Sequence, residues 1–237
     1  MKLRILILSI FGTFIFNSCT SDSNSNNQNN NPSTILPKKV IYQNTADEYI
    51  YEFFYNQDKI NYIKITTGID YYQNCYFTYD GDLITNITYE DSSQNILYIE
   101  DFTYSNNRLI NSSINGEVIF DYVYNSDGTI IVTSPGGGQG IIYTYNNGMI
   151  TKRFNQDITY FSTNSPFKNI KGIDSCYFTL DLQGGLLNKL FFSTKLNVNS
   201  GADYYYTYTY DNNLFPLLVN EIPPTLGGQG TYNISYY

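Results

Sequence analysis

The chain has 237 residues, with 21 Asp and Glu against 13 Lys and Arg and no histidine. The acidic balance disfavours nucleic acid as a partner, because an acidic surface repels phosphates. The absence of histidine removes the commonest general base and metal ligand, which disfavours catalysis. Most of the large apolar surface must come from 26 Tyr and 15 Phe, since there is no tryptophan.

Residues 1–18 have the features of an export signal. Lys2 and Arg4 precede an apolar run that ends at Phe16, and this run is shorter than the roughly 20 apolar residues of a membrane-spanning helix. Ser18-Cys19 stands where signal peptidase II cleaves before a lipidated cysteine. We therefore expect lipidation of Cys19, which makes the membrane a partner. The alternative is an ordinary secretory signal that leaves Cys19 free.

Residues 19–36 are predicted to form a disordered Asn- and Ser-rich tether behind the lipidated cysteine, because Thr20 to Thr34 offer no apolar side chain to a core. The tether predicts an exported protein of the cell envelope, at the outer membrane, with its periplasmic or surface face left open. Removal of residues 1–18 leaves 11 basic against 21 acidic residues, a net charge near −10. Residues 37–237 are predicted to be a single Tyr-rich all-β domain.

A hairpin repeat runs through this domain. Six segments place a tyrosine at the end of an alternating aromatic strand, just before a turn of Asn, Asp, Gly or Ser, at Tyr55, Tyr79, Tyr104, Tyr124, Tyr145 and Tyr210. The first five tyrosines are separated by 24, 25, 20 and 21 residues, about one β-hairpin each. A return strand follows each turn, such as Leu83, Thr85, Ile87 and Tyr89. The pattern predicts an antiparallel meander that forms a curled sheet, either an open spiral or a wide barrel-like wall.

The repeat becomes irregular between Tyr145 and Tyr210. Residues 162–174 indicate a loop or a single helical turn. Residues 176–181 echo residues 75–80, since both begin Cys-Tyr-Phe-Thr, and this echo predicts a diverged hairpin with its turn at residues 183–185. Nothing before Ile150 indicates a helix.

The turn-centred units resemble the YD repeats of Rhs and teneurin-type proteins. Tyr124–Ile130 has the pattern Tyr-Asx-x-Asp-Gly-x-Ile. The chain is more similar to uncharacterised lipoproteins of Bacteroidetes, which carry an Asn-Pro-Phe-Lys-Asn segment; here residues 164–169 match it with Ser165 inserted. Residues 210–216 resemble their Tyr-Asx-x-x-Gly-Phe-Pro motif, with Leu214 in place of glycine. The resemblance covers residues 40–237, implies a curved β wall in the envelope and leaves the activity open.

The polar motifs are better explained by turns than by chemistry. Calcium needs six to eight converging oxygens, and residues 80–82 and 125–128 lack the further acid that completes such a loop. Residues 137–140 and 227–230 repeat Gly-Gly-Gln-Gly, but neither tetrapeptide opens a helix, so we expect flexible turns and not phosphate loops. Glu90-Asp91 and Glu100-Asp101 are neighbours that point to opposite faces of a strand. We therefore predict no catalytic residues, no metal and no cofactor.

Cys75 and Cys176 leave two interpretations open. An exported domain with two cysteines can pair them as a disulfide, which requires their Cα atoms to lie within about 7 Å. The alternative is two small buried thiols.

Adjacent tyrosines carry the functional hypothesis. Residues 71–72, 204–206 and 236–237 place rings on both faces of their strands, where rings can stack on sugars or anchor a protein, although tyrosine can also serve as general filler. We expect a membrane-anchored, non-catalytic binding or envelope-structural module for a neutral glycan or a protein partner. The alternatives are a hydrolase with acidic catalytic residues and an accessory subunit of an outer-membrane system.

Overall fold

The computed structural model describes residues 34–68, 71–136, 140–146, 149–176, 196–201, 204–222 and 229–237, with the backbone alone for 196–201 and 204. Cys19, the predicted signal and the tether up to residue 33 lie outside the described residues. Thr34–Tyr237 form one compact unit. Everything below concerns this unit.

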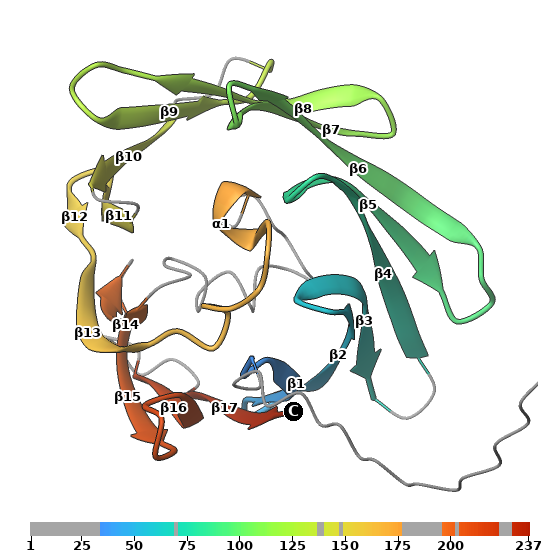
Figure 1. The fold of residues 1–237 in the computed structure, drawn as a ribbon, viewed down its shortest axis with the longest axis vertical. Coiled ribbons are helices and arrows are strands. Elements are labelled where there is room, and N and C mark those ends of the chain that lie inside the picture. The colour runs from blue at the N-terminus through green and yellow to red at the C-terminus, as the bar shows by residue number, and fades with distance from the viewer. Residues whose placement is uncertain are drawn as a thin grey trace, which may run out of the picture. The chain divides into compact units, whose positions relative to one another are not determined.

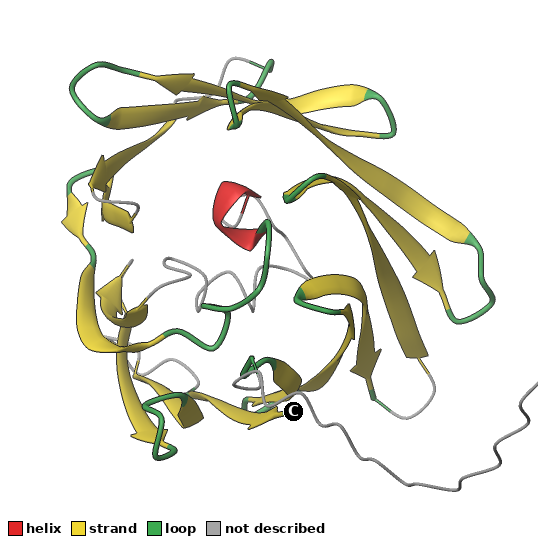
Figure 2. Ribbon diagram, viewed as in Figure 1, coloured by secondary structure: helices red, strands yellow, loops and turns green. Residues whose placement is uncertain are grey.

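The described residues form seventeen strands and one short helix (Figure 2). The strands are β1 (Pro37–Gln43), β2 (Glu48–Asn56), β3 (Lys59–Thr67), β4 (Tyr71–Asp80), β5 (Leu83–Asp91), β6 (Ile96–Ser105), β7 (Arg108–Ile114), β8 (Glu117–Tyr124), β9 (Thr129–Thr133), β10 (Ile141–Asn146), β11 (Met149–Arg153), β12 (Gln156–Asp157), β13 (Thr159–Asn164), β14 (Leu196–Gly201), β15 (Tyr204–Tyr210), β16 (Pro216–Ile222) and β17 (Gly230–Tyr236). The helix is α1 (Ile173–Cys176). No helix precedes residue 150 in the described part of the chain, as predicted.

The strands form one antiparallel meander that curls back on itself (Figure 1). Each strand from β1 to β11 pairs with the next strand in the chain. In addition, β1 pairs with β17, and the strands from β17 back to β13 pair in turn. Between β12 and β13, both of them described, no ladder is formed; they are consecutive pieces of chain separated by Ile158, whose N–H donates to the Thr151 carbonyl. The predicted all-β curled meander is confirmed.

The six repeat tyrosines hold equivalent positions, at the last or next-to-last residue of β2, β4, β6, β8, β10 and β15. In five of these hairpins the return strand carries one extra residue, a β-bulge, beside the tyrosine; these residues are Asn61, Thr85, Ile110, Thr151 and Leu217. The bulge breaks the period of two. As a result Ile84, and not Leu83 or Thr85, is buried at the start of β5, which corrects the predicted alternation.

Several tyrosine hydroxyls link one strand pair to the strand pair before it. Tyr79 pairs with Ile84 across its own hairpin, and the Tyr104 hydroxyl of the next hairpin donates to the Ile84 carbonyl over 2.8 Å. In the same way, the Tyr55 hydroxyl donates to the Pro37 carbonyl and the Tyr236 hydroxyl donates to the Pro216 carbonyl, both over 2.8 Å. The Tyr79 hydroxyl instead accepts a hydrogen bond from the Ile60 N–H over 3.0 Å. The links extend across the β17–β1 contact, because Pro37 is the strand partner of Tyr236.

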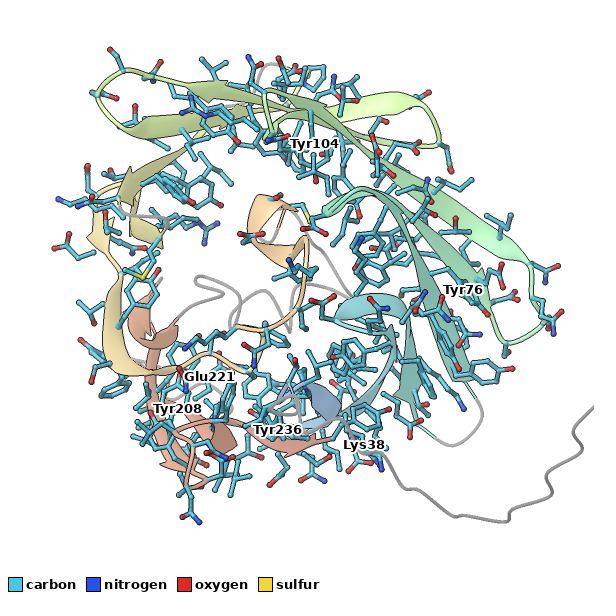
Figure 3. All side chains as sticks on the ribbon, in the orientation of Figure 1. Lys38, Tyr76, Tyr104, Tyr208, Glu221 and Tyr236 are labelled. Carbon is cyan, nitrogen blue, oxygen red and sulfur yellow. The ribbon has the colours of Figure 1, made fainter. Side chains whose placement is uncertain are left out.

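The hydrophobic core lies on the inner face of the curled sheet. Figure 3 shows Tyr104 and Glu221 on this side. The largest fully buried side chains are Tyr51, Tyr89, Tyr206, Tyr232, Phe53, Phe167, Ile60, Ile63, Ile65 and Ile84. Aromatic rings supply six of these ten side chains, and four of the six belong to tyrosines, so tyrosine does serve as the general core filler.

Residues 165–176, here called the inner segment, pack against the inner face beside β5 and β7 (Figure 1). The buried residues of the inner segment recur at every third position, at Phe167, Ile170, Ile173 and Cys176. This interval fits its three-residue turns, in which the carbonyls of Ser165, Phe167 and Gly172 each accept a hydrogen bond from the N–H three residues later. The loop or helical turn predicted for residues 162–174 is confirmed from residue 165 on, whereas residues 162–164 belong to β13. Cys176 ends α1 and does not begin a strand, which corrects the predicted echo of residues 75–80; the rest of that hairpin lies outside the described residues.

The ordered unit begins before the predicted boundary at residue 37. Leu36 is buried, and its carbonyl accepts a hydrogen bond from the Tyr237 N–H over 3.0 Å. Asn169 of the inner segment donates to the Ile35 carbonyl over 2.9 Å. Residues 34–36 therefore belong to the domain and not to the tether.

The outer face of the sheet carries both polar side chains and exposed apolar ones, the latter including Val123 and Tyr205. Glu52, Lys64, Asn74 and Glu90 are successive cross-strand partners from β2 to β5, and all four are half-buried. Beside them, Phe54 and Tyr62 stack with ring centroids 4.2 Å apart. No helix among the described residues has the length and apolar character that crossing a bilayer requires.

Candidate functional site

The repeat tyrosines all lie at one end of the strands, and a groove opens at this end. We call it the turn-side groove. Its larger part is a cavity of about 1040 Å³ between the inner segment and the hairpin turns β2–β3, β4–β5 and β6–β7. It is lined by Thr34, Asp58, Lys59, Asp80, Gly81, Asp82, Leu83, Asn107, Lys168, Asn169, Ile170, Lys171, Gly172, Asp174 and Ser175.

Gly172 allows the inner segment to reach the hairpin turns. Its φ of +80° lies in the left-handed region, where a side chain is strained. A Cβ added here would also lie 2.7 Å from the Asp82 carbonyl oxygen and 3.0 Å from the Tyr79 ring. Beside it, the Lys171 N–H donates to the Asp58 carbonyl over 2.9 Å. The groove wall is therefore set by backbone contacts that only glycine permits.

Asp82 is the electrostatic centre of the groove. Its carboxylate receives the Lys171 ammonium at 3.2 Å and the Lys59 ammonium at 3.4 Å. The Lys171 hydrogen bond, followed by the Lys171 charge, lowers the pKa of Asp82 below its usual value, and the same contact raises the pKa of Lys171. Asp82 is therefore held ionised, which is the opposite of what a general acid needs.

The smaller part of the groove, a cavity of about 310 Å³, adds aromatic walls. It shares Asn107, Asp174 and Ser175 with the larger part and continues to Tyr124 and Tyr145. Tyr145 is 36% exposed, so part of its ring remains open to a ligand. The Arg108 guanidinium lies over the Tyr124 ring, 5.3 Å from its centroid, and burial raises the pKa of Tyr124 to about 12.

The lining of the whole groove is balanced in charge. Asp58, Asp80, Asp82 and Asp174 face Lys59, Lys168, Lys171 and Arg108. Carboxylates accept hydrogen bonds, ammonium and guanidinium groups donate them, and the amides of Asn107 and Asn169 do both. Such a surface matches a neutral ligand rich in hydroxyls. It offers little net attraction to an ion of either sign.

The predicted aromatic positions divide between groove and core. Tyr124 and Tyr145 line the groove, whereas the remaining four repeat tyrosines bond to backbone or neighbouring side chains around it. Neighbouring tyrosines do face opposite ways: Tyr205 is 59% exposed and Tyr206 only 2%. On the outer face, however, rings such as Phe54 and Tyr62 cover each other.

Cys75 and Cys176 are buried in the structure and no disulfide joins them. Desolvation by burial raises the pKa of both thiols well above the usual range, with a smaller contribution from Glu100. Such thiols are poor nucleophiles, because the thiolate is the reactive form.

The acidic pairs and glycine motifs have structural roles. Glu100 is buried, while Asp101 accepts a hydrogen bond from Asn86 over 2.7 Å on the outer face, so this pair points to opposite faces as predicted. Gly140 and Gly230 end the two Gly-Gly-Gln-Gly motifs, and an added Cβ would lie 2.8 Å from the Val132 carbonyl and 2.6 Å from the Tyr42 ring, respectively. The first residues of both motifs lie outside the described residues.

The turn motifs considered for calcium act in turns. Asp127 accepts hydrogen bonds from the Thr129 N–H over 2.9 Å and from the Thr129 hydroxyl, and Asp82 is occupied by lysines. Among the described residues, no group of three or more Cys, Asp or Glu side chains is arranged to hold a metal ion.

Sequence reasoning missed the groove itself. Lys171, Gly172 and Asp174 fall in the segment for which the sequence predicts only a loop or a helical turn. The groove was not foreseen because Asp58 and Asp82, which Lys171 contacts, lie about ninety or more residues earlier in the chain. One local signal was present. Gly172 stands between Lys171 and Ile173, within a segment whose apolar residues recur every three positions, and an isolated glycine in such a pattern marks a close approach of the backbone.

No protein-family model matches this chain, and no curated protein sequence matches it. It is similar to a porin-like protein from Bacteroides uniformis ATCC 8492, with 13% identity over 85% of this chain and 98% of that chain and a TM-score of 0.38. A porin-like protein from Bacteroides vulgatus ATCC 8482 shares 14% identity over 86% of this chain and 99% of that chain, with a TM-score of 0.40. These similarities are too low to support a function, so the proposal below rests on the groove.

Proposed function

We propose that the protein is a non-catalytic, membrane-anchored binding module whose turn-side groove holds a neutral glycan. The observation that carries this proposal is the charge-balanced, hydroxyl-binding lining of the groove next to the ring faces of Tyr124 and Tyr145. Sugars present hydroxyls at their edges and C–H groups on their faces, so a polar wall and an aromatic wall serve them together.

The groove is a better glycan site than the outer aromatic face. On the outer face, Phe54 and Tyr62 stack at 4.2 Å with an angle of 7° between their planes, and Tyr76 follows at 5.4 Å. Rings packed in this way cover one another's faces and present mainly edges to solvent. Tyr145 is as exposed as Tyr76, at 36% each, but it lies within a concave site.

A glycan array probed with the full chain tests the proposal, with calorimetry to measure the affinity of any sugar that binds. We expect neutral oligosaccharides to bind more tightly than sulfated or uronate-rich ones. Tyr145→Ala should weaken binding about 2- to 12-fold, the equivalent of about 0.5–1.5 kcal/mol for a ring contact. Tyr71→Ala is the control, because Tyr71 is 44% exposed and lies outside the groove.

Two further variants probe the polar wall. Asp174→Asn keeps the shape of an exposed side chain and removes its charge, and Asn107→Gly removes an amide at a position whose φ is +60°, which glycine adopts freely. Both should weaken the same glycan. Binding of none of the sugars, binding of anionic sugars alone, or affinities that none of the groove variants changes would refute the glycan site.

The membrane anchor is a separate part of the proposal, supported by the signal and the cysteine in residues 1–19. Metabolic labelling with a palmitate analogue should label the native chain, and Cys19→Ala should lose the label and the membrane association. Equal labelling of both would place the lipid elsewhere.

A further inference from the structure

A second cavity opens at the opposite end of the strands from the repeat tyrosines. We call it the far-side pocket. Its volume is about 490 Å³, and it lies among the start of β6, the end of β7, the start of β8 and the residues that follow β9. The walls include Ile114, Val118, Ile119 and Phe120, and residues 134–136 form an exposed edge. The pocket is therefore apolar along most of its sides.

One carboxylate lines this apolar pocket. Glu100 is only 4% exposed, and the Tyr89 hydroxyl donates to its Oε2 over 3.1 Å. The Tyr98 ring, which also lines the pocket, stacks on the Tyr89 ring with centroids 4.1 Å apart. Tyr89 therefore holds the Glu100 carboxylate in place, and the Tyr98 ring holds the Tyr89 ring in place. None of the nine residues that line the pocket is basic.

We infer that the far-side pocket binds an organic ammonium ion with an apolar body. The ammonium group would meet the Glu100 carboxylate, where low solvent exposure strengthens the attraction between opposite charges. The body would lie against Val118 and Phe120, and the rings of Tyr98 and Phe120 add cation–π attraction. A volume of about 490 Å³ is within the usual range for small-molecule sites.

This ligand class is distinct from the glycan proposed for the turn-side groove. Apolar walls leave sugar hydroxyls without partners, and the carboxylate repels anions. The inference does not depend on the glycan proposal, because the two cavities have no lining residue in common.

Benzylammonium is a suitable probe, with benzyl alcohol as its uncharged control, and binding can be measured by saturation-transfer NMR and calorimetry on the full chain at pH 7. We expect benzylammonium to bind at least tenfold more tightly than benzyl alcohol. Glu100→Gln keeps an oxygen acceptor for Tyr89 and removes the charge, so it should abolish that difference. Equal binding of the two probes by the native chain, or a preference that Glu100→Gln leaves unchanged, would overturn the inference.

A second pair of variants decides the matter if Glu100→Gln does not fold. Val118→Trp fills the mouth of the pocket, while Val123→Trp adds the same ring to the same strand outside it; these valines are 40% and 52% exposed. Thermal unfolding verifies that both variants fold. Val118→Trp should weaken benzylammonium at least tenfold and Val123→Trp should leave it unchanged. Equal affinity in the two variants would contradict the site.

Discussion

The hydroxyl links between hairpins predict a specific loss of stability when a repeat tyrosine becomes phenylalanine. Tyr104→Phe keeps the ring and removes the 2.8 Å hydrogen bond to the Ile84 carbonyl. A hydrogen bond of this kind contributes about 0.5–1.5 kcal/mol, and the loss is at the upper end when the acceptor is buried and left without a partner. Tyr55→Phe and Tyr236→Phe remove equivalent bonds of 2.8 Å.

The loss at Tyr104 should add to the other two, because it involves a separate hairpin, whereas Tyr55 and Tyr236 both adjoin Pro37 and their two losses are coupled. The triple variant should therefore lose up to about 4.5 kcal/mol. For a domain of this size, about 1 kcal/mol lowers the melting temperature by about 2–4 °C. Each single variant should accordingly melt a few degrees lower than the native chain, and the triple variant lower than any of them.

Urea titration and calorimetry measure these changes, and Tyr205→Phe is the matched control. Tyr205 is 59% exposed on a strand of the same sheet, so loss of its hydroxyl should change the free energy of unfolding by less than about 0.5 kcal/mol. If Tyr55→Phe, Tyr104→Phe and Tyr236→Phe lose no more stability than Tyr205→Phe, the hydroxyl links do not hold adjacent hairpins together and the reasoning fails.

Three further predictions concern the inner segment and the groove. Gly172→Ala should lower the free energy of unfolding by about 2–4 kcal/mol through strain and overlap, whereas Gly116→Ala, with a similar φ of +84° and open space around it, should cost only about 1–2 kcal/mol in a urea titration. Cys75 and Cys176 should resist iodoacetamide in the native chain and both react after denaturation without reductant; a mass that shows a disulfide between them would contradict the structure. The pKa of Asp82 is lowered, so its ion pairs stabilise the fold above the unfolded pKa and are lost as pH falls through the folded one. The deficit in melting temperature of Asp82→Asn should therefore be present at pH 7 and shrink as the pH falls through the lowered pKa of Asp82, with Asp80→Asn as the control; a deficit that stays the same at acid pH would exclude the ion pairs as its cause.

The sequence predicted the repeat well because the repeat is local. A tyrosine, a turn and a return strand lie within one hairpin, so alternation at period two and Asx-Gly chemistry are enough to find them. The bulge at Thr85 was not predictable in this way, because one extra residue changes the face of its neighbours and leaves no compositional mark.

The turn-side groove depends on contacts that are distant in the chain. Lys171 reaches Asp82 across 89 residues, and no periodic signal joins them. The sequence did indicate that Glu100 points to the inner face. Glu100 lies two residues before Phe102 and four before Tyr104 on one alternating strand, so the three side chains are expected on the same face of the sheet. Which neighbours would surround it followed only from the strand register.

A crystal structure of the full chain with the glycan selected by the array tests the proposed function most directly. The groove proposal predicts a sugar ring against Tyr145, with its hydroxyls bonded to Asp174 and Asn107. A glycan on the outer face beside Phe54 and Tyr62, with the turn-side groove free of sugar, would contradict it.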